Sequence, residues 1–137
     1  CILLYKSKED LIVSALRDNV QKNHEIYSEE RSWEYVMRKN LEFCEKHRHL
    51  MIWLSANVDQ SPAELRSLMF EYMCRHVLND ETLLRAELSK TGSLRFYCGG
   101  IAAVVECWIK NHFRESKEEI AALIAAQMPR EWLDCKP

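Results

Sequence analysis

The segment from 93 to 115, SLRFYCGGIAAVVECWIKNHFRE, carries apolar side chains on almost every side of a helical wheel. Only Glu106 and Lys110, four residues apart and opposite in charge, mark an evident strip for solvent. A helix that is apolar nearly all round has to be covered nearly all round. In a chain of 137 residues, such a helix can be covered either by lying at the centre of the monomer or by contact with a second subunit. We expect two copies of the chain to share this helix.

Two sides of this helix differ in the size of their side chains. One side carries the large residues Tyr97, Ile101, Val104, Val105, Trp108 and His112. The adjacent stripe is mostly small and consists of Phe96, Gly100, Ala103 and Cys107. The tandem Gly99-Gly100 lowers helix stability by roughly 2 kcal/mol relative to two alanines. Close approach of another backbone would offset that loss, so the pattern favours a helix-on-helix interface.

Residues that break secondary structure are rare, with three glycines and three prolines in the whole chain. Together with the many Leu, Ala, Glu, Lys and Arg residues, this favours an all-α fold, an antiparallel bundle of five to six helices. A break is expected near 47–49, and a short helical pattern over 83–88 is expected to close on Gly92. Pro129 should stop the last helix. Cap signals place helix starts at Ser7, Ser32, Ser61 and Ser116, where Glu119 completes a capping box for the last of them.

Charge and composition argue against several classes of protein. The net charge is −2 with both signs interleaved, which is unlike the basic face of a domain that grips nucleic acid by itself. No apolar run approaches the roughly twenty residues of a membrane span, and no signal-peptide pattern is visible. The six cysteines are scattered without a CxxC pair, which favours core thiols in a reducing cytosol. We therefore expect a cytoplasmic protein without membrane contact.

Catalytic patterns are largely missing from the sequence. No Glu-x-x-His pair, HExxH motif, glycine-rich phosphate loop or GxSxG elbow occurs, so we expect no enzyme activity, no cofactor and no metal. One alternative stays open, a small helical enzyme or metal carrier that uses Cys44, His47, Cys74 and His76. Core cysteines beside surface histidines would explain the same residues.

Soft and aromatic side chains from several helices suggest a pocket. Aromatic and thioether groups with a few polar tips are typical of a site for an apolar ligand. They are equally typical of an ordinary core, and the sequence leaves both interpretations open. The predicted ligand-binding residues are Trp53, Met69, Tyr72, Met73 and Phe96.

Three stretches resemble the TetR type of transcription regulator. YKSKEDLIVSAL, at 5–16, is similar to the junction between the DNA-reading helix-turn-helix and the long linking helix of that family. FYCGGIAAVVECWIKNHFRESKEEIAALI, at 96–124, resembles the C-terminal signature of one large branch. EFCEKHRHLMIWL, at 42–54, resembles a helix pair in the middle of the same branch.

The resemblance implies a division of the chain. Residues 1–6 would be the end of a DNA-binding domain that the chain lacks, with Lys6 and Lys8 as weak phosphate contacts. Residues 7–128 would form a helical ligand-binding and dimerisation domain, and 129–137 a tail that docks through Trp132.

The resemblance also implies a homodimer that binds a small apolar ligand and controls DNA binding through the missing domain. The ligand would shift the spacing of the two DNA-binding heads. An alternative is a helical protein–protein interaction module without a small-molecule ligand. The dimer contact expected from the last two long helices contains Gly100, Ala103, Cys107, Trp108, Ile120, Leu123 and Ile124.

Overall fold

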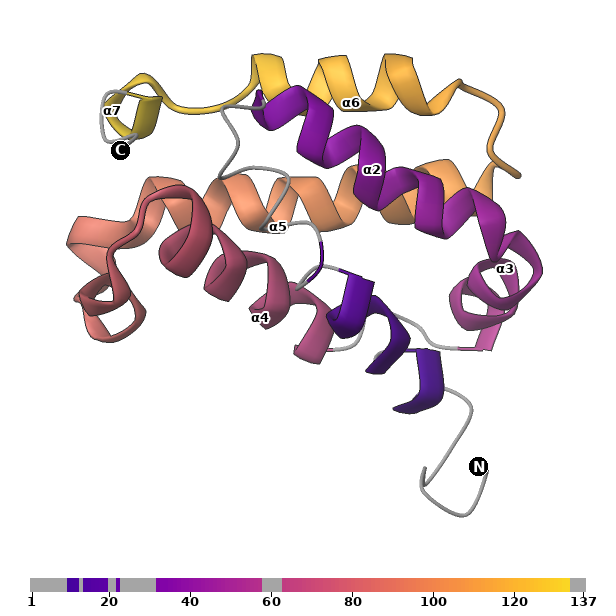
Figure 1. Cartoon of the computed structure of the whole chain (residues 1–137), viewed down its shortest axis with the longest axis horizontal. Coiled ribbons are helices and arrows are strands. Elements are labelled where there is room, and N and C mark those ends of the chain that lie inside the picture. The colour runs from indigo at the N-terminus through magenta and orange to yellow at the C-terminus, as the bar shows by residue number, and fades with distance from the viewer. Residues whose placement is uncertain (1–9, 13, 20–21, 23–31, 58–62, 134–137) are drawn as a thin grey trace.

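Helices dominate the computed structural model, which describes residues 10–12, 14–19, 22, 32–57 and 63–133 (Figure 1). No strand occurs within these ranges, and the predicted all-α class is confirmed. The predicted caps Ser7 and Ser61 lie outside the described residues. The principal helices are α2 (Trp33–Lys46), α3 (Arg48–Asn57), α4 (Ala63–Tyr72), α5 (Leu88–Lys110), α6 (Lys117–Ala126) and α7 (Arg130–Leu133).

Helix α5 is the longest of these, with 23 residues, and the bundle is built around it. Helices α3 and α4 pack against α5, while α2 packs chiefly against α6 (Figure 1). Helix α6 runs in the opposite direction to α5 and makes few close backbone contacts with it. The core between these helices contains Val36, Met37, Leu41, Met73, Leu94 and Trp108.

Helix α2 begins where its cap predicts. The Ser32 hydroxyl accepts a hydrogen bond from the backbone N–H of Tyr35 at 3.1 Å, which satisfies one of the free donors of the first turn. The helix ends at His47, whose φ of −110° leaves the helical region, and α3 starts at the next residue. The predicted break near 47–49 is therefore confirmed.

The connector before α5 differs from its prediction. After α4, a π-helical turn (Met73–Val77) is followed by a 3-10 helix (Glu81–Arg85), which begins where the Asp80 carboxylate accepts from the N–H of Thr82. Helix α5 then starts at Leu88 and continues through Gly92 without interruption. The prediction that a short helical pattern closes on Gly92 was wrong, because this glycine keeps a negative φ inside the helix.

The turn between α5 and α6 folds the end of α5 back on itself. His112 and Phe113 adopt left-handed backbone conformations, with φ of 57° and 58°, which is uncommon for residues with a side chain. The reversal brings the Phe113 ring edge-to-face against Trp108, with ring centroids 4.7 Å apart. The indole Nε1 of Trp108 donates to the carbonyl of Glu115 at 2.8 Å. The turn therefore covers the Trp108 side chain from within its own chain.

Helix α6 starts with the predicted capping box. The Ser116 hydroxyl accepts from the N–H of Glu119 at 3.1 Å, and the Glu119 carboxylate accepts from the N–H of Ser116 at 3.2 Å. This exchange satisfies two backbone donors reciprocally and fixes the point at which the chain re-enters a helix.

The residues after α6 pack back onto the start of α5. Trp132 on α7 is buried, and its Nε1 donates to the hydroxyl of Ser93 at 2.8 Å. The Ser93 hydroxyl in turn donates to the Glu131 carboxylate. Trp132 therefore docks as predicted, while the domain boundaries at 6 and 128 stay predictions.

Candidate functional site

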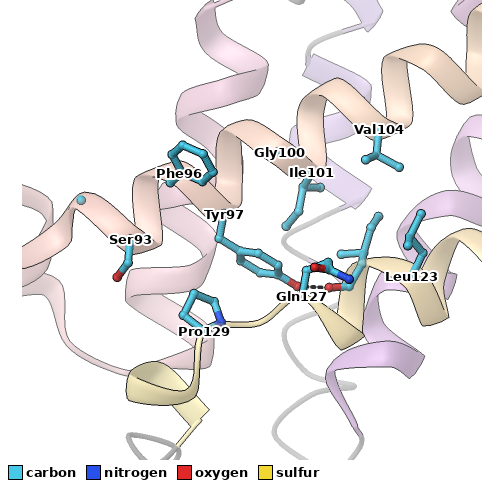
Figure 2. Close-up of a pocket in the computed structure, with 11 residues that line it drawn as sticks. Ser93, Phe96, Tyr97, Gly100, Ile101, Val104, Leu123, Gln127 and Pro129 are labelled. Carbon is cyan, nitrogen blue, oxygen red and sulfur yellow. Dashed lines mark hydrogen bonds between the residues drawn. The ribbon is translucent and has the colours of Figure 1, made fainter.

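An open groove of about 520 Å³ runs between α5 and the C-terminal half of α6 (Figure 2). Tyr97 and Ile101 point from α5 toward α6, where Leu123 and Gln127 form the opposite wall. Almost every group on these walls is apolar. The groove is lined by Gly92, Ser93, Phe96, Tyr97, Gly100, Ile101, Val104, Leu123, Ile124, Gln127 and Pro129.

Two large apolar side chains at the rim of the groove are exposed to solvent. Phe96 is 85% exposed and Leu123 is 47% exposed. Single exposed apolar residues are ordinary, but an apolar groove framed by an exposed aromatic ring marks a surface that a partner or a ligand covers. The stripe that continues from Phe96 along α5, formed by Gly100, Ala103 and Cys107, is exposed as well.

The structure divides the predicted dimer residues into two groups. Gly100, Ala103, Cys107 and Leu123 are exposed and lie on or next to the groove. The other three are buried inside their own chain: Trp108 (2% exposed), Ile120 (6%) and Ile124 (2%). The expectation that the side chain of Trp108 needs a second subunit for cover was wrong, because Phe113 and the Glu115 carbonyl already cover it. A dimer contact, which stays a prediction, would rest on the exposed group.

The glycines of α5 are not required by packing within the chain. A Cβ atom built on Gly92, Gly99 or Gly100 meets no other atom within 4 Å. Alanine at each position would favour the helix by roughly 1 kcal/mol and would fit the isolated chain. Since no described residue of the same copy explains these glycines, the open space beside them is available to a binding partner.

A chain of buried polar contacts connects α2, α5 and α6 behind the groove. The indole Nε1 of Trp33 donates to the Tyr97 hydroxyl at 2.9 Å, and this hydroxyl donates to the Ile124 carbonyl at 2.5 Å, the dashed line in Figure 2. The ring of Trp33 also stacks on that of Tyr72, with centroids 6.2 Å apart. Burial raises the pKa of Tyr97 to about 12, although the hydrogen bond from Trp33 lowers it in part. The phenol therefore stays protonated and keeps its donor role at neutral pH.

The predicted ligand residues are not brought together as one set. Tyr72 and Met73 lie in the core, and Trp53 and Met69 are half-buried against it. Phe96 lies apart from them, at the rim of the groove between α5 and α6. A signal for this position was present in the sequence, because Phe96 shares a helical stripe with Gly100, Ala103 and Cys107. Pattern reasoning did not identify Trp33 or Tyr97 as the link between α2 and α6.

Comparison with known proteins relates the sequence of this region to a family. A sequence model described as a transcriptional regulator C-terminal region, of the TetR type, matches residues 31–129. The chain belongs to the TetR family of transcriptional regulators. Comparison with curated proteins and with solved structures found no match.

The TetR match includes both walls of the groove. Every residue that lines the groove, from Gly92 to Pro129, falls inside the matched range. Lys6 and Lys8, the weak candidates for phosphate contact, lie outside both the match and the described residues. Membership of the TetR family supports, in general terms, a ligand-binding and dimerisation domain of a regulator rather than an enzyme.

The metal-carrier alternative for this TetR-family domain receives no support from the placement of its thiols. Within the described ranges no group of three or more metal-binding side chains occurs. Burial raises the pKa of Cys44 to about 12 and that of Cys74 to about 11, and a metal ligand needs the opposite, an accessible thiolate. His47 packs its ring against Phe43, with centroids 4.6 Å apart.

A search of the described helices for a membrane-spanning segment found no candidate that combines the necessary length with sufficient hydrophobicity.

The buried thiols predict that this TetR-family domain loses stability in alkali. Burial raises the pKa of Cys44 and of Cys98 to about 12, above the ordinary value of 9.0 that an unfolded chain would have. The unfolded state therefore releases protons first, so the stability conferred by the protonated thiols is fully present below pH 9 and declines above it. Urea unfolding under reducing conditions should give a free energy that falls from pH 8 to pH 10.

Two substitutions separate these thiols from other alkaline effects. Replacing Cys44 with alanine should make the fall of the unfolding free energy with pH shallower. Replacing the exposed Cys107 with alanine should leave the slope of that fall unchanged. Equal slopes for the parent chain and the Cys44→Ala variant would show that this thiol does not control the alkaline loss.

Proposed function

We propose that the chain is the effector-sensing and dimerisation domain of a TetR-family regulator, in which a small apolar ligand controls DNA binding through the dimer. The observation that carries this proposal is the open groove between α5 and α6, framed by Phe96 and Leu123. The family supports a domain of this general kind. The homodimer, the apolar ligand and the allosteric control are the proposed part.

A second copy of the same chain suits the groove for reasons of shape. Dimers of soluble proteins are mostly two-fold symmetric, so the same patch meets itself and must present both a projection and a recess. This face presents the Phe96 ring as the projection and the open space beside Gly100 as the recess. Ala103 and Cys107 extend a smooth exposed stripe along α5, which permits close approach of a facing helix.

Coupling between ligand and dimer would follow the contacts behind the groove. Tyr72, one of the predicted ligand residues, stacks on Trp33, which hydrogen-bonds to Tyr97. Tyr97 lines the groove and holds the last turn of α6 through the Ile124 carbonyl. A ligand that moves Tyr72 would therefore act on both walls of the groove. By linkage, such a ligand shifts the dimer arrangement only as far as it binds one arrangement more tightly.

Thiol labelling tests the dimer directly. Cys107 is exposed on the α5 stripe, whereas Cys44, Cys74 and Cys98 are buried. In a Cys1→Ser, Cys135→Ser background, maleimide should modify Cys107 quickly in dilute protein. The labelling rate should fall at least tenfold as the protein concentration is raised through the dimer dissociation constant, because the partner covers the stripe.

A matched thiol placed away from the groove controls for a general effect of concentration. Leu88 is 68% exposed and does not line the groove, so a Leu88→Cys thiol in a Cys107→Ala background should label at the same rate at every concentration. Protection of both thiols, or of neither, would argue against a dimer through α5 and α6. A chain that stays monomeric in sedimentation at micromolar concentration would favour the interaction-module alternative.

A further inference from the structure

We propose that a second cavity, of about 410 Å³, binds an organic anion that carries an apolar body, with Arg95 as its charged contact. This cavity lies between α4, the 3-10 helix Glu81–Arg85 and α5. Its lining differs completely from that of the groove between α5 and α6. The site needs neither a dimer nor DNA, so it stands or falls separately from the proposed function.

Arg95 is held in place by two contacts, one at the Nε edge of its guanidinium group and one on a face of that group. Its Nε donates to the hydroxyl of Thr91 at 3.2 Å, and Thr91 is itself fully buried. Its central carbon lies 4.0 Å from the centroid of the Phe70 ring, within the range of a cation–π contact. Both contacts restrict the rotamers of the side chain before a ligand arrives, which lowers the entropic cost of binding.

The outer edge of this guanidinium has no carboxylate within ion-pair distance among the described residues. Arg75, by contrast, pairs with Glu81 at 3.0 Å, and Lys110 pairs with Glu106 at 2.9 Å. An arginine whose Nε and one face are already engaged suits an acid group such as a carboxylate or a sulfonate, which takes two parallel hydrogen bonds from the remaining N–H groups.

The floor of the cavity is apolar and has room beside the charge. Phe70 and Cys98 are buried beneath it, and Leu84 forms part of the wall. Gly99 follows Arg95 by one helical turn, and a Cβ on Gly99 would meet nothing within 4 Å. A volume of about 410 Å³ is in the range that holds a small organic ligand. One cation beside the apolar side chains of Phe70, Leu84 and Cys98 favours an organic acid over inorganic phosphate, while Ser67 and Glu71 make the rest of the lining polar.

Glu71 sets a limit on this preference. It lines the same cavity and is exposed, and its negative charge opposes an anion. Coulomb repulsion across a wet rim is weak, whereas hydrogen bonds from a positioned arginine to an acid are among the strong ones. Removal of the Glu71 charge should therefore tighten the binding of an anion. If the cavity instead took a ligand with an amino group, the same change would weaken binding.

Two naphthalene probes test the site because they differ in one group. 8-Anilino-1-naphthalenesulfonate carries a sulfonate, and N-phenyl-1-naphthylamine has the same rings without it. In fluorescence titrations, Arg95→Gln should weaken the sulfonate probe at least tenfold and leave the neutral probe within twofold. Glu71→Gln should tighten the sulfonate probe about twofold at low salt. Gly99→Leu should weaken both probes, because its side chain fills the cavity.

Lys90→Gln is the matched control, since it removes an equal charge from the same helix outside the cavity. Arg95 and Gly99 are both exposed, so thermal midpoints close to that of the parent chain should confirm that the variants fold. The proposal is overturned if Arg95→Gln behaves like Lys90→Gln, if both probes lose affinity equally on loss of Arg95, or if Glu71→Gln weakens the sulfonate probe.

Discussion

Replacing Phe96 with arginine is expected to convert the proposed dimer into a monomer and to leave the isolated chain as stable as before. Phe96 is 85% exposed in one copy, so the substitution removes almost no packing within that copy. In a two-fold dimer the same residue enters the interface twice, and each arginine would have to lose water against an apolar wall. Central aromatic residues contribute about 2 kcal/mol or more to an interface. A dissociation constant at least 100-fold weaker is therefore expected.

Sedimentation equilibrium over a range of concentrations measures this effect, and two further variants interpret it. Leu123→Arg alters the opposite wall of the groove and should weaken the dimer in the same way. Leu88→Arg also replaces an exposed apolar residue, at 68% exposure, but lies away from the groove and should leave association unchanged. If all three variants weaken association equally, the chain associates through general hydrophobicity and not through this groove.

Alanine substitutions of the glycines extend the same experiment, because a change that stabilises the isolated chain can at the same time weaken the dimer. Gly99→Ala and Gly100→Ala should each stabilise the isolated chain by about 1 kcal/mol, because alanine favours the helix and both positions have open space. Only Gly100 lines the groove. Gly100→Ala should therefore weaken the dimer if a facing helix approaches closely there, and Gly99→Ala should not.

Local signals in the sequence identified the helices whose ends are fixed by local chemistry. Ser32 and the Ser116–Glu119 pair satisfy backbone donors with their own side chains, so the sequence reveals both helix starts. The start of α5 was missed because Glu87 makes no such side-chain bond at its first turn. Gly92 was then interpreted as a helix end, because the sequence alone does not distinguish a glycine inside a helix from a glycine that stops one.

The site was harder to predict because it depends on how the chain reverses direction. The helical wheel separates the large face of α5 from its small stripe, and that separation matches the observed burial of Trp108 and exposure of Ala103. It gives no sign that Phe113 turns back onto Trp108. That contact requires two consecutive left-handed residues, and although histidine adopts this conformation more often than most residue types, phenylalanine seldom does.

Replacing Trp33 with alanine is expected to remove about 3–5 kcal/mol from the free energy of unfolding. Trp33 is 3% exposed and stacks on Tyr72, so its removal leaves a large cavity between α2 and the centre of the bundle. Domains of this size are stable by only about 5–15 kcal/mol, so the loss is a large part of the total. Urea unfolding at pH 7 measures it.

The polar part of this effect can be isolated from the cavity with smaller changes. Tyr97→Phe removes the hydroxyl and leaves the buried indole N–H of Trp33 without its acceptor, at a cost of about 1–3 kcal/mol. The Ile124 carbonyl keeps a partner in that variant, because it also accepts from the N–H of Gln127 at 3.2 Å. Trp33→Phe removes the donor instead. The double variant should be less destabilised than the sum of the two single variants, by about 1 kcal/mol.

Trp132→Phe is the matched control for loss of an indole donor, because Trp132 donates to Ser93 at the edge of the fold and not at its centre. It should cost less than Tyr97→Phe. Additive effects of Trp33→Phe and Tyr97→Phe would mean that the two side chains do not act as one unit, and the route from α2 to the groove would lose its physical basis. With coupling, the Tyr97→Phe chain should also dimerise more weakly, since the Ile124 carbonyl in the last turn of α6 then loses its hydrogen bond to α5.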